Sequence, residues 1–106
     1  MSITLIYVPC KNSLEAKKIA RILIDKSLIA CANLMPINSI FWWNGNFKEE
    51  NEVVLLCKTT NKLEKDARNE IKIQHSYDVP AIISWKVDVN KDFEGWIGTE
   101  TQKLFK

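Results

Sequence analysis

Short apolar runs rich in β-branched residues recur along the chain and predict strands. Three such runs cover residues 3–8, 52–59 and 81–89. Residues 30–43 form a longer extended region that is interrupted near Pro36. Because proline lacks the amide hydrogen that a sheet ladder needs, Pro36 predicts a bend, a bulge or an edge position. The pattern as a whole predicts four extended segments.

Two segments show the three-to-four-residue spacing of an amphipathic helix. The first covers residues 13–26, which Ser13 can cap, and its apolar positions are Ala16, Ile19, Ala20 and Leu23. The second covers residues 61–74, where Asn61 together with Glu64 resembles a capping box. A short closing helix is predicted by the apolar residues Phe93, Trp96 and Ile97.

The Asn44-Gly45 step lies between aromatic residues and predicts a tight hairpin turn. The element order is then β-α-β-β-α-β followed by a short C-terminal helix. This is the α+β, ferredoxin-like split arrangement, with a long hairpin between the second and third strands. Since 106 residues are the length of one domain, we expect a single domain over residues 1–106.

The predicted sheet carries apolar residues on both faces. In the first strand Ile6 and Val8 alternate with Leu5 and Tyr7, and the third strand and the hairpin repeat this two-sided pattern. Two helices can cover only one face of a four-stranded sheet, and no third long helix is predicted. The remaining apolar face therefore predicts self-association into a homo-oligomer.

Charge and composition exclude several classes of function. Fifteen Lys+Arg against thirteen Asp+Glu give a formal net charge of +2, which does not supply the concentrated basic face of a nucleic-acid binder. Residues 52–59 also lack the basic, glycine and aromatic start of an RNA-recognition strand. No apolar run reaches the roughly 18–20 residues that a membrane span needs. We expect a soluble protein that binds neither nucleic acid nor membrane.

The three cysteines are odd in number, widely spaced and without a CxxC pair. This pattern argues against a disulfide framework and against a structural zinc site, and it favours a reducing compartment. We therefore expect a cytoplasmic protein. Cys31 and Cys57 lie in apolar runs, whereas Cys10 is predicted to lie in a loop and to be the most accessible thiol.

His75 is the only histidine, so any histidine-dependent chemistry must pass through it. It follows the predicted second helix, where the helix dipole favours it as a purely structural residue. A metal ligand or proton carrier beside Tyr77 and Asp78 fits the same position. A Cys–His nucleophilic pair has no third-group signature here, and the glycines form no phosphate-binding loop. We therefore do not expect an enzyme.

Five segments resemble, in order, the motifs of a known family. Residues 28–34 read LIACANL, residues 39–45 read SIFWWNG, and residues 52–59 read EVVLLCKT. Residues 75–83 read HSYDVPAII, and residues 93–97 are similar to a tyrosine/tryptophan C-terminal segment. Together they resemble the CutA divalent-cation tolerance family.

The resemblance implies a ferredoxin-like subunit that assembles as a tight homotrimer, with strands extended across subunit boundaries. It also implies kinship to the PII signalling proteins, tolerance to divalent metals and copper binding, and it brings no established catalytic activity. The leading hypothesis is a trimer that binds a divalent metal such as copper, or a small ligand, at intersubunit clefts, with no obligatory cofactor. The alternative is a non-catalytic trimeric signalling or scaffold module.

The resemblance further implies roles for particular residues. His75 stands at the position of the family histidine and is the candidate metal ligand. Val8 and Ala81 stand where copper-associated bacterial members carry a cysteine and an acidic residue. Cys10, two residues further on, is therefore the candidate soft ligand. The candidate residues of a ligand cleft are Trp42, Lys58 and Tyr77.

Overall fold

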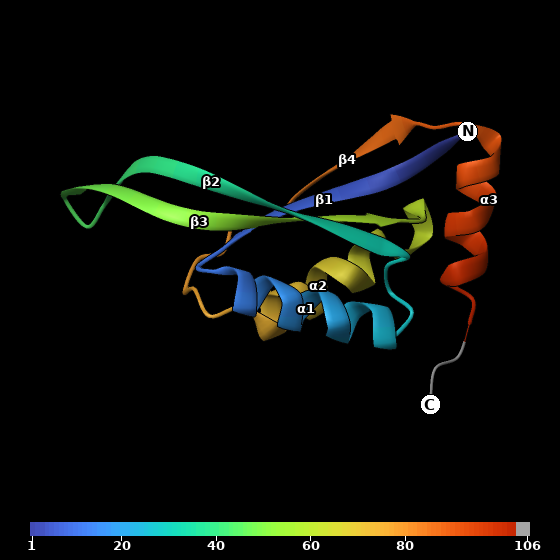
Figure 1. Cartoon of the computed structure of the whole chain (residues 1–106), viewed down its shortest axis with the longest axis horizontal. Coiled ribbons are helices and arrows are strands. Elements are labelled where there is room, and N and C mark those ends of the chain that lie inside the picture. The colour runs from blue at the N-terminus through green and yellow to red at the C-terminus, as the bar shows by residue number, and fades with distance from the viewer. Residues whose placement is uncertain (104–106) are drawn as a thin grey trace.

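The computed structural model describes residues 1–103, which form one antiparallel sheet with helices packed against it (Figure 1). In chain order the elements are β1 (Ser2–Cys10), α1 (Ser13–Asp25), β2 (Cys31–Trp43), β3 (Asn46–Thr59), the 3₁₀ turn η1 (Asn61–Leu63), α2 (Glu64–Gln74), β4 (Ile83–Asp88) and α3 (Lys91–Glu100). The strands lie in the order β2-β3-β1-β4, and each neighbouring pair is antiparallel. This confirms the predicted ferredoxin-like arrangement with its long hairpin and C-terminal helix.

Side chains alternate between the two faces of the sheet. On β1, Ile6 and Val8 are fully buried against α1 and α2, which lie on the same side of the sheet (Figure 1). Leu5 and Tyr7 point to the opposite side. We call the side of Ile6 and Val8 the helix face and the side of Leu5 and Tyr7 the open face.

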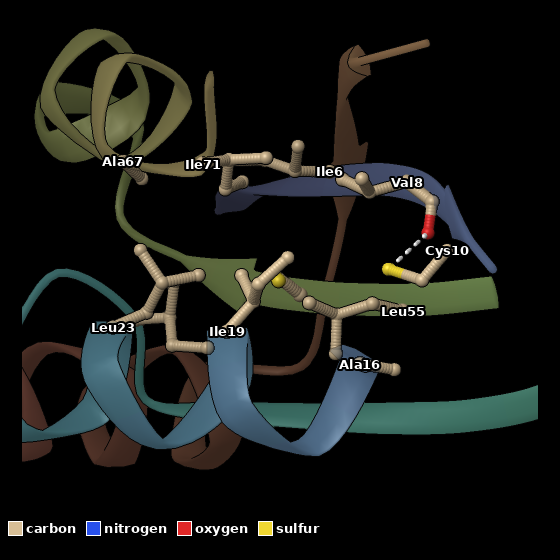
Figure 2. Packing of buried hydrophobic residues seen from close by; sticks show 11 residues of the cluster. Ile6, Val8, Cys10, Ala16, Ile19, Leu23, Leu55, Ala67 and Ile71 are labelled. Carbon is tan, nitrogen blue, oxygen red and sulfur yellow. Dashed lines mark hydrogen bonds between the residues drawn. The ribbon is translucent and has the colours of Figure 1, made fainter. Parts of the chain in front are cut away.

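The hydrophobic core lies between the helix face and the two helices (Figure 2). Its buried strand residues are Ile6, Val8, Cys10, Leu55 and Cys57, and its buried helix residues are Ala16, Ile19, Leu23, Ala67 and Ile71. They include most of the predicted apolar positions of α1. Because burying one large aliphatic side chain stabilises a protein by about 1.5–3 kcal/mol, this layer is the main apolar contribution within the chain.

The N-terminal ends of the two core helices differ from the prediction. Asn12, not Ser13, caps α1, because the Asn12 side-chain oxygen accepts the Glu15 backbone N–H at 2.8 Å. Asn61 forms no capping box, and its side-chain oxygen instead accepts the hydroxyl hydrogen of Thr4 on β1 at 2.7 Å. Asn61 therefore fastens the start of β1 rather than the start of α2.

β2 runs through Pro36 without interruption, and Pro36 pairs with Val53 of β3. The order of the strands places β2 at an edge of the sheet. On an edge strand, one side of the backbone has no neighbour, so proline's missing N–H removes no ladder bond there. Of the three alternatives that Pro36 predicted, the edge position is the one found.

The hairpin turn lies at Asn44 and Gly45, as predicted, with φ values of 51° and 77°. These left-handed values suit asparagine and glycine, and they give the twist of a two-residue hairpin. β3 begins directly after the turn, at Asn46 rather than at residue 52, because its polar first half pairs with β2. β4 begins at Ile83, two residues later than predicted.

β2 and β3 extend far beyond the end of β1. The ladder between β1 and β3 ends where Cys10 pairs with Val53, while the ladder between β2 and β3 continues to the turn. Residues 37–52 therefore form a two-stranded arm that projects from the body of the molecule (Figure 1). The molecule is correspondingly elongated, with extents of 45 × 31 × 21 Å.

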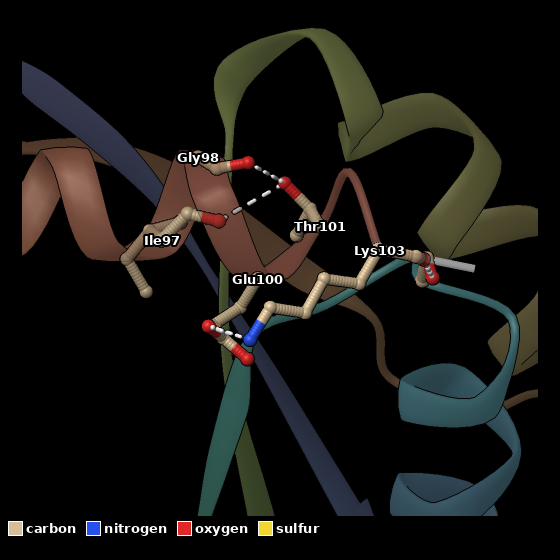
Figure 3. A network of polar contacts seen from close by, with 6 residues as sticks. Ile97, Gly98, Glu100, Thr101 and Lys103 are labelled. Atoms are coloured by element: carbon tan, nitrogen blue, oxygen red, sulfur yellow. Dashed lines mark hydrogen bonds and ion pairs between the residues drawn. The ribbon is translucent and has the colours of Figure 1, made fainter. Parts of the chain in front are cut away.

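α3 stands at the end of the sheet where β1 begins (Figure 1). Its residue Ile97 is fully buried. The helix ends where the Thr101 hydroxyl donates to the carbonyls of Ile97 and Gly98, at 3.0 and 3.1 Å (Figure 3). Lys103 and Glu100 form an ion pair at 2.7 Å beside this end (Figure 3). α3 thus closes one end of the sheet and leaves the open face uncovered.

The open face exposes large apolar side chains. Those that are between 38% and 51% exposed are Met35, Phe41, Trp43, Ile83 and Trp85. They come from β2 and from β4, so they span the sheet from one edge strand to the other. The predicted two-sided apolar sheet is therefore present, and within residues 1–103 its second face remains accessible.

Two isoleucines on the helices provide a matched test of the core. Ile19 is fully buried, whereas Ile73 is 73% exposed. We expect Ile19→Ala to lower the free energy of unfolding by about 2–5 kcal/mol, because it leaves a cavity between α1 and the sheet. Ile73→Ala should change it by less than about 0.5 kcal/mol. Chemical denaturation of both variants measures the difference, and equal losses would contradict the assigned core.

Candidate functional site

Three side chains that can bind a metal come together at the end of β1. They are Cys10 at the end of that strand, Glu15 in the first turn of α1, and His75 directly after α2. One donor atom of each lies within 4.8 Å of the others, and among residues 1–103 this is the one such group. We call it the Cys10–Glu15–His75 cluster.

The His75 ring uses both of its nitrogens within the chain. Nε2 lies 2.8 Å from the Pro9 carbonyl oxygen, and Nδ1 accepts the Tyr77 backbone N–H at 3.1 Å. Since Nδ1 accepts and a carbonyl can only accept, the proton of the neutral ring is on Nε2. His75 is 9% exposed, and its ring also packs against the Tyr77 ring, with 4.7 Å between the ring centroids. His75 thus joins the end of β1 to the segment that follows α2.

The Glu15 carboxylate joins the same two parts of the chain. One oxygen accepts the Lys11 backbone N–H at 3.0 Å, and the other accepts the Ser76 backbone N–H at 2.9 Å. Burial by itself would raise the pKa of Glu15, but hydrogen bonds from Ser76 and Lys11 and the nearby His75 outweigh it. The net effect is a lowered pKa of Glu15, and the carboxylate is ionised at neutral pH.

Cys10 is fully buried at the end of β1, so the predicted accessible loop position is wrong. The reason is that β1 continues past Pro9, and Cys10 pairs with Val53 of β3. The thiol lies 3.6 Å from the Val8 carbonyl oxygen, to which it donates (Figure 2). Burial, followed by the charges of Glu15 and Glu52, raises the pKa of Cys10 to about 12, so it is a thiol rather than a thiolate at neutral pH.

A groove of about 680 Å³ lies beside the cluster, between the base of the arm and residues 76–81. Its aromatic lining comes from Phe41, Trp43 and Tyr77. The Tyr77 hydroxyl donates to a Glu52 carboxylate oxygen at 2.6 Å. Burial and this bond to Glu52 raise the pKa of Tyr77. Tyr77 therefore connects the His75 segment to the arm.

Several residues of this region escape prediction from the sequence. The sequence does not indicate Glu15 as a candidate residue, because its partners are backbone groups and one of them, the Ser76 amide, is distant in sequence. Phe41, Trp43 and Glu52 also line the groove without having been proposed. The hairpin register could have shown that these residues share a face of the arm. Phe41 pairs with Lys48, and residue 52 lies an even number of positions from residue 48, so its side chain lies on the same face.

The structure does not bring Trp42 and Lys58 to this groove. Trp42 is 70% exposed on the arm and packs edge-on against Phe47, with 5.7 Å between the ring centroids. Lys58 lies six residues beyond Glu52 on β3, which corresponds to about 20 Å along the strand. Its Nζ atom lies 5.6 Å from the centroid of the Phe93 ring of α3. Of the three predicted cleft residues, only Tyr77 lines the groove.

A comparison with known proteins identifies the family of this chain. A model of the family described as "CutA1 divalent ion tolerance protein" matches residues 4–100. The chain belongs to the CutA1 family. This confirms the resemblance that the sequence motifs carried.

Relatives of known name cover nearly the whole chain. The divalent-cation tolerance protein CutA of Pyrococcus horikoshii is 39% identical over 100 residues, which are 93% of this chain and 98% of that protein. A solved CutA1 structure from the same organism has a TM-score of 0.90 at 38% identity and covers 94% of this chain and 99% of that one. CutA1 from Ehrlichia chaffeensis has a TM-score of 0.90 at 36% identity, covering 93% and 94% of the two chains.

A further CutA structure concerns cellular location. The protein of Archaeoglobus fulgidus is described as periplasmic, and it matches with a TM-score of 0.89 at 34% identity over 95% of this chain and 99% of that one. In the described part of this CutA1 family member, no helix combines the length and the apolar character needed to cross a membrane.

The lowered pKa of Glu15 predicts a specific dependence of stability on pH. A carboxylate whose pKa is lower in the folded than in the unfolded chain stabilises the fold above its ordinary pKa of 4.5. This stabilisation is lost as the pH falls through the lower folded value. At pH 7 we expect Glu15→Gln to lower the free energy of unfolding by about 1–3 kcal/mol. The gap to the wild type should narrow towards pH 3.

Denaturation of wild type and variant between pH 7 and pH 3 measures this effect. Asp25→Asn is the matched control, because Asp25 is an exposed partner of Arg21 and should matter by less than about 0.5 kcal/mol. A constant gap between wild type and Glu15→Gln at every pH would show that the Glu15 charge is not the stabilising feature.

Proposed function

We propose that this CutA1 family member is a non-catalytic homotrimer that takes part in divalent-cation tolerance by binding a metal ion such as copper. The observation that carries the assembly is the open face. An isolated protein of this size rarely leaves tryptophan and isoleucine side chains exposed across a whole sheet face. Ile83 and Trp85 of β4 are 51% and 43% exposed there.

The projecting arm supports the same proposal. An isolated two-stranded ribbon is marginally stable in water, and it needs a further surface against which to pack. The arm carries exposed apolar side chains on both of its faces: Ile40, Phe41, Trp42, Trp43 and Phe47. A neighbouring subunit would supply the missing surface. The proposed number of subunits, three, and the proposed relationship to PII proteins follow from the family resemblance.

The metal proposal rests on the donor set of the Cys10–Glu15–His75 cluster. Thiolate and imidazole ligands suit copper and zinc. The hydrogen bond from His75 Nε2 to the Pro9 carbonyl is the backbone support that metal-binding histidines commonly have, which leaves Nδ1 as the ligating atom. Donor atoms around a tetrahedral zinc ion lie about 3.3–3.8 Å apart, so atoms within 4.8 Å need an approach of about 1 Å. The metal is bound as cargo, and we propose no obligatory cofactor.

The alternative function, a trimeric signalling or scaffold module, is favoured by a different observation. Every member of the cluster already has a hydrogen-bond partner within the chain: Cys10 with Val8, Glu15 with Lys11 and Ser76, and His75 with Pro9 and Tyr77. A purely structural cluster would look the same. Metal affinity therefore decides between the two functions.

A small-ligand cleft containing Trp42, Lys58 and Tyr77 requires contributions from different subunits. The separation of about 20 Å between Lys58 and Glu52, the partner of Tyr77, excludes one shared pocket within a single chain. We propose such a cleft only at subunit boundaries.

We also propose a cytoplasmic location, because the chain's three cysteines are free.

Assembly is tested by a matched pair of charge substitutions. Ile83 lies on the open face, while Ile73 lies on the outer side of α2 and is 73% exposed. We expect wild type and Ile73→Asp to sediment at three times the chain mass at micromolar concentration. Ile83→Asp should dissociate, because a buried unpaired carboxylate destabilises an interface. A monomeric wild type would refute the trimer, and circular dichroism checks that the variants fold.

Metal binding is tested by anaerobic titration with Cu(I) against a competing chelator, and in parallel with Zn(II). We expect Cys10→Ala and His75→Ala each to weaken binding at least about tenfold, because each removes a ligand. Cys31→Ala is the control, since Cys31 is outside the cluster. Equal affinity of wild type and His75→Ala would remove this site from the function and favour the scaffold alternative.

A further inference from the structure

Residues 76–81 connect α2 to β4 and are fastened at two places. The Ser76 and Tyr77 amides donate to Glu15 and to His75 Nδ1, which are both members of the cluster. The Tyr77 hydroxyl donates to Glu52 at the base of the arm. Beyond the segment, Arg68 donates to the Ile82 carbonyl at 2.8 Å and so anchors the start of β4 to α2. Because Ile82 is held in this way, we expect a displacement of the segment to end before Ile82.

At the cluster end of this segment, the atoms that hold it are the same atoms that would bind a metal. If His75 binds through Nδ1, that nitrogen no longer accepts the Tyr77 N–H. If His75 binds through Nε2, the ring proton must move to Nδ1, which then opposes the Tyr77 N–H donor to donor. Either choice of nitrogen breaks the bond to Tyr77. A Glu15 oxygen that becomes a ligand likewise weakens its bond to the Ser76 or Lys11 amide.

We propose that metal binding at the Cys10–Glu15–His75 cluster releases residues 76–81 and thereby opens the aromatic groove. The inference rests on the proposed metal site and adds its regulation. On binding, Cys10 loses its thiol proton to solvent and gives up its bond to the Val8 carbonyl. The released segment carries Tyr77 away from Glu52, so a groove wall moves when the cluster is loaded.

The energetic coupling is reciprocal. If metal binding opens the segment, loosening the segment beforehand must strengthen metal binding by the same factor. Tyr77→Phe removes the bond to Glu52 and keeps the ring that packs on His75. It changes no cluster member. Tyr7→Phe is the matched control, because Tyr7 lies on the open face of β1 and outside the groove lining.

The experiment combines Cu(I) titration with hydrogen exchange of the backbone amides. We expect Tyr77→Phe to bind Cu(I) about threefold to tenfold more tightly than wild type, and Tyr7→Phe to bind equally. In wild type, Cu(I) should accelerate exchange at residues 76–81 and leave α1 and β1 before Pro9 protected. Phe41, Trp43 and Tyr77 form the wall whose fluorescence reports the opening.

Two negative results have different meanings. Cu(I) binding that depends on His75, with unchanged affinity in Tyr77→Phe and unchanged exchange at residues 76–81, would overturn the coupling and leave the metal site standing. No Cu(I) binding by the wild type would overturn the metal site, and the coupling would fall with it.

Discussion

The sheet of this protein is apolar on both faces but carries helices on only one, and the rest of the structure depends on this imbalance. On the helix face, Ile6 and Val8 are sealed by α1 and α2. On the open face, side chains such as Trp85 remain 43% exposed, because α3 stands at the end of the sheet. The chain is therefore stabilised by packing on one side of the sheet and exposes apolar side chains on the other. An exposed apolar face of this extent is typical of surfaces that pack against another molecule.

Unequal strand lengths are the second constraint. β1 stops at Cys10, and its last pair with β4 joins Tyr7 to Ile83, so the Pro9 carbonyl and the Lys11 N–H lie beyond the β1–β4 ladder. Backbone groups outside a ladder need other partners, and here side chains supply them. His75 donates to Pro9, and Glu15 accepts from Lys11. The cluster thus caps a strand end, at the place where the arm leaves the body.

Sequence patterns predicted the elements that depend on local periodicity. The alternation in β1, the buried face of α1 and the Asn44-Gly45 turn were all legible in the chain, because each involves neighbouring residues. The first half of β3 was missed, because it is polar and becomes a strand only by pairing with β2. The sequence predicts a loop at Cys10 because a proline such as Pro9 indicates the end of a strand, whereas the pairing of β1 with β3 tolerates this proline.

The candidate site was predictable only in part, for the same reason. His75 and Tyr77 stood out as rare side chains in a short motif. Their partners, Glu15 and Glu52, are 60 and 25 positions away and carry no local signal. Only the folded chain shows that α1, the arm and residues 76–81 meet at one point.

The nature of that meeting point limits what the cluster can do. A preformed metal site keeps one imidazole nitrogen free for the ion and uses the other for support. Here the second nitrogen of His75 is occupied by the Tyr77 amide, and the Glu15 carboxylate by the amides of Lys11 and Ser76. A cation bound here would have to compete with hydrogen bonds to the backbone at every ligand, so weakly binding cations would be excluded and a tightly binding one would have to move the chain. In the proposed metal site, selectivity and conformational response would then be two consequences of the same hydrogen bonds.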